Sequence, residues 1–566
     1  MIFVNKFRGK TPKVDAKLLP AGFGQEAQNV DLRSGSLKPM KGLTQIQAIT
    51  KTGDIRTIYK IDDTWIYWTA IVDIVKAQVT NGDFRIAFTG DGYPKQTNKT
   101  MATAGAASTY PTTTRRLGII PPVVALTLEP QGTGDGSVAD TVSYLYTYVT
   151  AWGEESAPSP ATVVQDIEGD QYMRVKGFVI PVLADTGNDI AYFRLYRLAS
   201  GTTGAEYQLV KARPGAYSAS AVYDIPIAGV PNANTYVYDC DDNASPDALN
   251  DDLSDILPSE DWDNAPTALD GLVQFQNGIL AGFDTDELCP AEPMIPYAFP
   301  EDYKATIRDI VALGVYSDAL IITTDDFPYI AVGNDPATLM VQILPYNQAN
   351  LSKRGLISTN VGVTYPTPDG LFLINSVAGT IVTYGIYTKE QWAALSPANL
   401  ISFYYDEKYY GFFQGTGTGI ILDYKAVADE SLPFVQDISI ADTLFYGGYI
   451  DPEDDKLYLL VKEGSTYNIK SWETGADAIL SWKSAIFEEP YPINYGWARI
   501  SGTQTASKAI TFKLYADGTL KLTATVTSDE AFRLPSGFLA REWEFTVEGK
   551  AEIDSVFIGH TTEEEP

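Results

Sequence analysis

GLVQFQNGILAGF, residues 271–283, has apolar side chains on both sides of Asn277-Gly278, the dipeptide that most strongly indicates a tight β-hairpin. Similar pairs of strands recur through the second half of the chain at spacings of roughly 40–50 residues. They are DALIITTDDFPYIAVGND (318–335), DGLFLINSVAGTIVTYGI (369–386), EKYYGFFQGTGTGIILDY (407–424) and DKLYLLVKEGSTYNIKSWE (455–473). This period predicts an all-β chain built on a β-propeller, of roughly six to eight blades.

Residues 62–94 have the same hairpin character, but a different kind of segment separates them from the other repeats. The simplest prediction is one propeller interrupted by an inserted domain. Residues 1–120 then hold an N-terminal arm and the first blade or blades, and residues 268–486 hold the rest. Closing a propeller joins an early strand to a late one and removes free sheet edges, and we expect residues 29–43 to supply that strand.

The predicted insert covers residues 121–245 and resembles a fibronectin-III-like β-sandwich. SYLYTYVTAWGEESAPSP (143–160) alternates tyrosines with the period of a strand, and IAYFRLYRLASG (190–201) follows it. In fibronectin-III-like domains the tyrosine motif comes near the end, whereas here it comes first. Residues 487–566 predict a small C-terminal β-sandwich, with a turn at Asp517-Gly518.

The acidic segment 246–267 predicts a solvated linker between the insert and the later blades. Calcium binding is the alternative, but the segment lacks the EF-hand spacing with its central glycine and final glutamate. Helical periodicity is weak elsewhere, and three short helices are expected, at 25–30, 300–311 and 388–395. In the last of these, Thr388 and Gln391 have the spacing of a capping box.

The composition excludes several functions. Seventy-two acidic against 41 basic residues give a net charge of −31, which disfavours sequence-independent binding to nucleic acid. No apolar run approaches the roughly 18 residues of a membrane span, and the first residues lack the apolar core of a signal peptide. Cys240 and Cys289 are too few for a disulfide framework and indicate a reducing compartment.

Motifs for catalysis are weak. The single histidine, His560, follows the last expected strand and is predicted to be a surface residue, which disfavours Ser-His-Asp and Cys-His nucleophiles and histidine-rich metal sites. GTGTG (415–419) lacks phosphate-loop spacing and predicts a hairpin turn. A glycosidase would need two carboxylates at a defined separation, which sequence does not establish for the acids at the predicted propeller turns. These acids are Glu292, Glu301, Asp325, Asp326 and Asp369.

Three further sites admit two interpretations each. Trp152 either stacks on a sugar or, as we expect, packs at the end of a sandwich strand. Lys353-Arg354 and Arg115-Arg116 are the notable basic spots, and we expect solvated turns or subunit contacts there rather than nucleic-acid sites. No catalytic, cofactor-binding or metal-binding residue is therefore predicted.

Several stretches together resemble the tail proteins of short-tailed bacteriophages, of the nozzle or tail tubular protein B type, also described as head–tail stabilisation proteins. The resemblance is spread over most of the chain, and no single motif is diagnostic; one departure is Met294 and Phe299, where the family pattern has an aromatic residue and a tryptophan. The stretches are KLLPAGFGQEAQNVDLRSGSLKPMKG (17–42), LPSEDWDNAPTALDGLVQFQNGILAGF (257–283), AEPMIPYAFPEDY (291–303), GNDPATL (333–339), LSKRGL (351–356), TPDGLFLI (367–374), IYTKEQWAALSPANL (386–400) and FRLPSGFLAREWEFTVEG (532–549).

This resemblance implies a structural virion protein that forms a homo-hexameric ring below the portal and its adaptor. The ring would continue the DNA channel, retain the genome and allow its ejection, with double-stranded DNA passing without specific binding. Further implied partners are tail fibre, spike or needle proteins, with no membrane insertion and no cofactor, and assembly would take place in the host cytoplasm. The alternative functions are a receptor-binding or adhesion protein of the tail that recognises surface glycans, and a polysaccharide-degrading enzyme.

Overall fold

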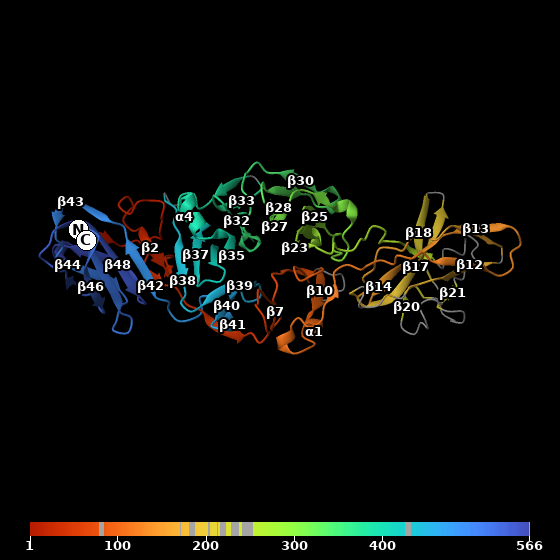
Figure 1. Cartoon of the computed structure of the whole chain (residues 1–566), viewed down its shortest axis with the longest axis horizontal. Coiled ribbons are helices and arrows are strands. Elements are labelled where there is room, and N and C mark those ends of the chain that lie inside the picture. Colours follow the sequence, from red (N-terminus) through yellow and green to blue (C-terminus); the bar gives the residue numbers. More distant parts are fainter. Residues whose placement is uncertain are drawn as a thin grey trace.

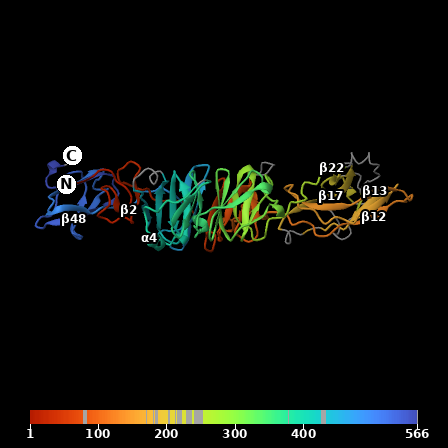
Figure 2. The same ribbon diagram turned by 90° about the horizontal axis from the view of Figure 1, so that it is seen from above.

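The computed structural model describes residues 1–77, 84–169, 171–179, 181, 187–201, 204–211, 213–214, 222–227, 237–239, 253–376, 378–424 and 432–564. Among these residues nearly all secondary structure is β-strand, and no helix exceeds six residues. The predicted all-β class is therefore confirmed. The molecule is elongated, and a C-terminal body, a central body and the inserted body follow one another along its long axis (Figure 1). Figure 2 shows the same linear order from a second direction.

The central body contains seven antiparallel sheets, numbered here in chain order. Sheet one is β6 (Thr57–Ile61) and β7 (Thr64–Trp68); sheet two is β8 (Asp73–Ala77), β9 (Arg85–Thr89), β10 (Lys95–Asn98) and β11 (Arg115–Arg116); sheet three is β23 (Asp270–Gln274), β24 (Leu280–Asp284), β25 (Glu287–Pro290) and β26 (Ala305–Thr306). Sheet four is β27 (Ile310–Tyr316), β28 (Ala319–Thr324), β29 (Tyr329–Val332) and β30 (Met340–Ile343); sheet five is β31 (Ile357–Ser358), β32 (Val363–Thr367), β33 (Gly370–Ile374) and β34 (Gly379–Ile381). Sheet six is β35 (Leu400–Tyr405), β36 (Lys408–Phe413), β37 (Thr418–Asp423) and β38 (Gln436–Ser439), and sheet seven begins with β39 (Leu444–Asp451), β40 (Lys456–Glu463) and β41 (Thr466–Ser471).

The first strands of these sheets contact one another in sequence. From sheet two onward, β8 contacts β23, β23 contacts β27, β27 contacts β31, β31 contacts β35, β35 contacts β39, and β39 contacts β6 of sheet one. Sheets one and two share an apolar cluster that includes Trp68 and Phe88. Every other successive pair, including sheets seven and one, shares a cluster of its own. Burial of these side chains holds each sheet against two neighbours.

Sheet seven is completed by a strand from near the start of the chain. β5 (Thr44–Ala48) pairs antiparallel with β41. The prediction that residues 29–43 supply this strand is wrong. Within that segment β3 (Val30–Asp31) and β4 (Lys38–Pro39) pair with each other, because a turn at Gly35, whose φ is 84°, folds the segment back on itself.

Two of the three predicted helices are wrong. Residues 24–28 form β2 (Gly24–Gln28), which pairs with β38 on one side and β42 (Leu480–Ser484) on the other, so tertiary pairing overrides helix propensity there. Residues 300–311 contain the short 3-10 turn η4 (Glu301–Tyr303), then β26 and the start of β27. The third helix is confirmed as α4 (Lys389–Ala394), with the capping box between Thr388 and Gln391.

The C-terminal body places two sheets around one apolar core that includes Trp482, Trp543 and Phe545. Its first sheet is β1 (Ile2–Val4), β49 (Ile553–Gly559), β44 (Trp497–Gly502) and β47 (Phe532–Arg533). Its second is β42, β48 (Ala540–Gly549), β45 (Ile510–Ala516) and β46 (Thr519–Val526), with β43 (Phe487–Ile493) beside β48. Strand β2 joins this second sheet to sheet six, so one sheet runs through both bodies.

The inserted body is built around the tyrosine strand. β14 (Tyr144–Thr150) is buried on both faces and pairs antiparallel with β17 (Ile190–Gly201), so the two motifs recognised in the sequence are neighbours. The other strands are β12 (Thr127–Gln131), β13 (Val138–Val142), β15 (Gln165–Glu168), β16 (Tyr172–Lys176), β18 (Gly204–Val210), β19 (Arg213–Pro214), β20 (Ile225–Pro226), β21 (Val237–Asp239) and β22 (Leu253–Ile256). Because β22 pairs with β18, residues 253–256 of the predicted acidic linker belong to this body.

Candidate functional site

A cluster of charged groups in the central body surrounds the sequence Ser352-Lys353-Arg354, where the short turn η6 (Lys353–Gly355) begins. The Lys353 ammonium lies 2.5 Å from a carboxylate oxygen of Asp73 and 2.7 Å from one of Asp270. Asp73 starts β8 and Asp270 starts β23, so one lysine connects the first strands of two sheets. We call Asp73, Asp270, Lys353 and Arg354 the axial cluster.

The same segment reaches two more first strands. Arg354 Nη1 donates to the carbonyl of Tyr446 in β39 at 2.6 Å, and Ser352 Oγ donates to the carbonyl of Leu400 in β35 at 3.0 Å. A Cβ at Gly447 would lie 2.7 Å from Arg354 Nη2 and 2.9 Å from the backbone oxygen of Arg56, so glycine allows this close approach. Three consecutive residues thus connect β8, β23, β35 and β39.

The electrostatics of the axial cluster follow from this geometry. Burial raises the pKa of Asp73, with Lys353 opposing the rise and Asp270 adding to it. Burial lowers the pKa of Lys353, but the two carboxylates outweigh it and the net shift is upward. Burial lowers the pKa of Arg354 to about 10. At neutral pH the two cations therefore stay charged beside the acids.

Sequence reasoning placed Lys353-Arg354 in a solvated turn or a subunit contact, and the structure corrects the first of these two alternatives. The side chains are directed to partners within the same chain, and only 22% of the Lys353 side chain is exposed. The partners of Lys353 and Arg354 lie tens to hundreds of residues away in the sequence, so no local sequence pattern indicates these contacts.

A second charged cluster lies where the inserted body meets the central body. Arg85 Nη1 in β9 lies 2.7 Å from Glu154 Oε1, and the two side chains are only 1% and 3% exposed. Gln96 in β10 donates to the other oxygen of Glu154 at 3.0 Å. Burial raises the pKa of Glu154 to about 7, against the effect of Arg85. We call Arg85, Gln96, Trp152 and Glu154 the junction cluster.

Trp152 belongs to the junction cluster. It follows β14, and the Arg85 guanidinium lies over its ring, 4.1 Å from the ring centre. This contact within the chain is the packing role expected for Trp152. Arg115 and Arg116 lie nearby: Arg115 Nη2 is 3.4 Å from Asp189, and Arg116 donates to Thr267 at 3.2 Å.

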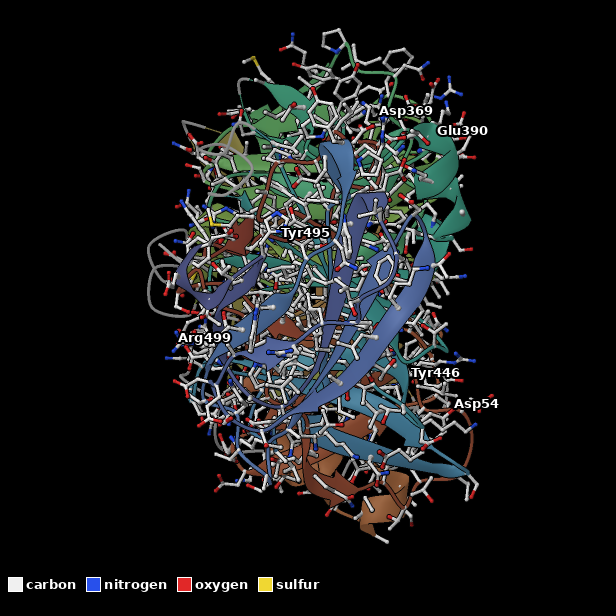
Figure 3. The ribbon with its side chains drawn as sticks, turned by 90° about the vertical axis from the view of Figure 1, so that its left-hand side faces the viewer. Asp54, Asp369, Glu390, Tyr446, Tyr495 and Arg499 are labelled. Carbon is white, nitrogen blue, oxygen red and sulfur yellow. The ribbon has the colours of Figure 1, made fainter. Side chains whose placement is uncertain are left out.

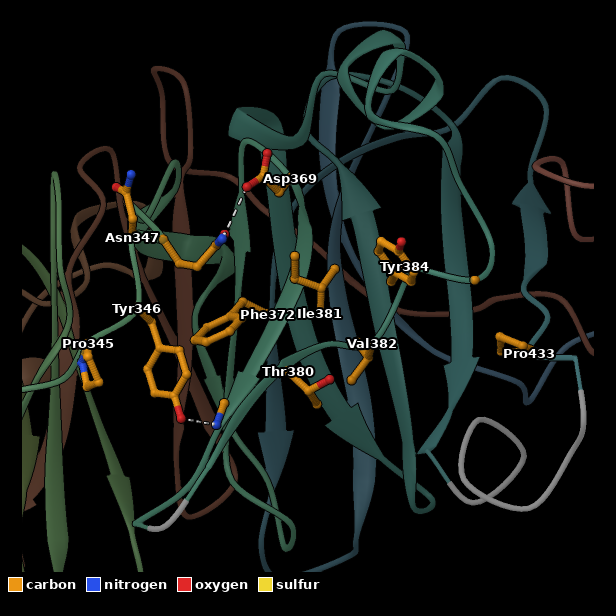
Figure 4. Close-up of a pocket in the computed structure, with 13 residues that line it drawn as sticks. Pro345, Tyr346, Asn347, Asp369, Phe372, Thr380, Ile381, Val382, Tyr384 and Pro433 are labelled. Atoms are coloured by element: carbon orange, nitrogen blue, oxygen red, sulfur yellow. Dashed lines mark hydrogen bonds between the residues drawn. The ribbon is translucent and has the colours of Figure 1, made fainter.

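A concavity on the outer edge of sheet five has a volume of about 790 Å³ (Figure 4). Phe372 and Ile381 lie between Tyr346 on one side and Tyr384 on the other. Asp369, one of the acids considered from sequence, is at its rim, where Gln348 donates to the carboxylate at 3.1 Å and Lys389 pairs with it at 2.6 Å. We call this concavity the sheet-five groove.

The remaining turn acids are separately paired. Glu292 accepts from the Tyr303 hydroxyl at 2.7 Å, Glu301 pairs with Lys304, and Asp325 and Asp326 both lie near Arg308. The structure thus gathers Asp325 and Asp326 around one arginine and places Asp369 in the groove.

The other sequence candidates have structural explanations. GTGTG joins antiparallel β36 and β37, which confirms the predicted hairpin turn. His560 is exposed after β49, as predicted, and Cys289 is buried, whereas Cys240 lies outside the described residues. In the part of the chain that the structure describes, no three His, Cys, Asp or Glu side chains are grouped to hold a metal ion. The helices described there are also too short or too polar to traverse a bilayer.

Comparisons with known proteins return no matching family model and no matching curated protein. Solved structures give alignments at low identity. Glutaminyl cyclase from Myxococcus xanthus is 12% identical over 36% of this chain and 89% of its own, with a TM-score of 0.21. PorZ, a surface component of the type-IX secretion system of Porphyromonas gingivalis, is 10% identical over 90% and 77%, with a TM-score of 0.25. Exo-β-1,3-galactanase from Phanerochaete chrysosporium is 10% identical over 73% and 98%, with a TM-score of 0.15. Similarities this low carry no argument about function.

Proposed function

We propose that the seven sheets of the central body are the blades of a closed seven-bladed β-propeller, interrupted by a fibronectin-III-like sandwich and followed by a C-terminal sandwich. The support is that each sheet shares an apolar cluster with the sheet before and the sheet after it, including sheets seven and one. The outer strand of sheet seven is β5, from near the start of the chain. Such a strand joins the early and late parts of the chain and protects the sheet edge.

The proposed function is that of a structural virion protein, forming the hexameric nozzle ring below the portal and adaptor of a short-tailed bacteriophage. The sequence resemblance to nozzle proteins supports this proposal. The observation that carries a structural role is the axial cluster: Lys353 is bound to Asp73 and Asp270, and Arg354 to the carbonyl of Tyr446, all within one chain. These contacts join β8, β23 and β39 to the turn η6, which is the role of a structural cross-link.

The charge of the chain fits passage of DNA without specific binding. Six copies of a chain with net charge −31 carry about −186 in total. A channel with acidic walls repels phosphates, so DNA would move through it without electrostatic trapping. In this proposal the channel lies between subunits, because the centre of each propeller is occupied by the Lys353 and Arg354 side chains.

The mass of the assembled form tests this function. Six copies of 61.8 kDa give about 370 kDa. We expect six copies per particle by quantitative mass spectrometry of purified virions, and a six-fold ring below the portal by electron microscopy. The inserted body should lie at the periphery of that ring. A trimer that cleaves glycans, or an inserted body that lines the channel, would contradict the proposal.

A further inference from the structure

The sheet-five groove has the size and composition of a ligand site. Its volume of about 790 Å³ falls within the range of roughly 300–1,000 Å³ that is usual for small-molecule sites. Apolar residues of β33 and β34, or just after them, line its floor: Phe372 and Val382 are buried, and Ile381 is partly exposed. Polar side chains, including Gln348 and Asp369, surround that floor. Apolar surface with a few oriented polar groups is the pattern of a specific binding site.

Tyr384 forms one wall of the groove and is 70% exposed. The Lys13 ammonium lies 3.9 Å from the centre of its ring and donates to the Tyr384 carbonyl at 2.6 Å. The cation thus fixes the side chain from one side and leaves most of the ring exposed at the groove. An exposed aromatic ring held in one orientation is a suitable surface for stacking a sugar ring.

The charges around the groove are balanced. The Lys389 ammonium, 2.6 Å from Asp369, lowers the pKa of that carboxyl together with Gln348, so Asp369 stays ionised and accepts hydrogen bonds. Lys13 supplies a second cation, and Glu390 a second carboxylate. Asp369 and Glu390 lie near each other at one edge of the molecule, well away from Tyr446 and Asp54 (Figure 3). A site with balanced charge favours a neutral ligand over an acidic one.

The outer edge of β34 is already occupied. The N–H of Gly379 donates to the Tyr346 hydroxyl at 3.0 Å, and the carbonyl of Ile381 accepts from the N–H of Tyr384 at 3.2 Å. An extended peptide that added a strand to this sheet would need these groups free. The groove therefore favours a ligand that binds through hydroxyls and stacking rather than through a peptide backbone.

From these observations we propose that the sheet-five groove binds a neutral oligosaccharide. One sugar ring stacks on Tyr384, and hydroxyls of the neighbouring sugar rings donate to the Asp369 carboxylate and bond to the side-chain amides of Asn347 and Gln348. This site is separate from the axial cluster, and it does not depend on the proposed assembly.

The test measures binding of maltotriose, cellotriose and mannotriose to the full-length chain by saturation-transfer NMR and titration calorimetry. We expect at least one of them to bind with a Kd of about 10 mM or tighter, the range of a single shallow site. Tyr384→Ala should weaken it by about tenfold or more. Tyr491→Ala is the matched control, because Tyr491 is 75% exposed in the C-terminal body, and it should leave the Kd unchanged.

Asp369→Asn provides a second variant that keeps the shape of the rim. It should also weaken binding, with an unchanged far-ultraviolet circular dichroism spectrum. The proposal is overturned if none of the three sugars binds at about 10 mM, or if binding survives Tyr384→Ala. It is also overturned if a sialylated trisaccharide or an extended peptide binds at Tyr384 with a higher affinity than the neutral sugars.

Discussion

Replacing Arg85 by alanine would test whether the junction cluster holds the inserted body in place. The change removes the cation from a pair whose side chains are 1% and 3% exposed, and also removes the contact with the Trp152 ring. Breaking a buried pair from one side typically costs about 3–5 kcal/mol. Because burial already raises the pKa of Glu154 to about 7, this carboxyl can take up a proton in the variant, so we expect the lower end, about 3 kcal/mol.

A cost of this size should open the junction on the order of a hundredfold more often. Hydrogen–deuterium exchange measured by mass spectrometry should speed up by that factor in residues 85–89 and 150–156, and remain unchanged in β45 of the C-terminal body. Lys95→Ala on the next strand is the control. Lys95 pairs with an acid that is 45% exposed, so its loss should cost less than about 1 kcal/mol.

The loss of stability caused by Arg85→Ala should also increase as the pH rises. Without Arg85 the folded-state pKa of Glu154 stays above that of the unfolded chain, so the stability associated with the protonated carboxyl is lost as pH rises. Between about pH 5 and pH 8 the free energy of unfolding should therefore decrease more in the variant than in the parent chain. The double variant Arg85→Met/Glu154→Leu should recover most of the loss. Unchanged exchange in residues 85–89 would refute the reasoning.

Three smaller perturbations test other features. Lys353→Met leaves Asp73 and Asp270 without their shared cation. Because these two side chains are 27% and 37% exposed, we expect a destabilisation of about 1–3 kcal/mol, measured by chemical denaturation. Adding Asp73→Asn to this variant should make the destabilisation smaller. Thr388→Ala removes the capping hydrogen bonds of α4 and should cost about 0.5–2 kcal/mol in the same assay, whereas Thr388→Ser should cost little. Asp477 is bonded to two lysines that lower its pKa, so its contribution is present at neutral pH and lost as pH falls through its folded-state pKa. Asp477→Asn should therefore lower the unfolding midpoint at pH 7, and this difference should shrink as the pH falls below the ordinary range of an aspartate pKa.

Local rules were sufficient to predict several elements from the sequence. Asn277 and Asp517 both adopt positive φ, at 55° and 47°, each in a turn between two antiparallel strands. The capping box of α4 likewise depends only on Thr388 and Gln391. Each of these features is decided by side chains within four residues, so the sequence reveals it directly.

Long-range pairing explains the errors. The helix predicted over residues 25–30 is a strand because β38 and β42, more than 400 residues later, provide its partners. Lys353 is bound by Asp73 and Asp270, and Arg85 by Glu154, through contacts that no local pattern indicates. The sheet-five groove was also missed, because its walls come from separate connections that become neighbours only in the fold.

The pairing of the first strand with the last has a consequence for synthesis of the chain. In β1, residues Ile2 to Val4 pair with Ile558 to Val556, so these residues wait for nearly the whole polypeptide to leave the ribosome. β5 likewise waits for β41, whereas the inserted body is drawn from one contiguous stretch, residues 127–256. Contacts this distant in sequence form slowly, and unpaired strands are exposed meanwhile. We therefore expect the inserted body to fold first on the nascent chain, and the other two bodies to be completed only after release.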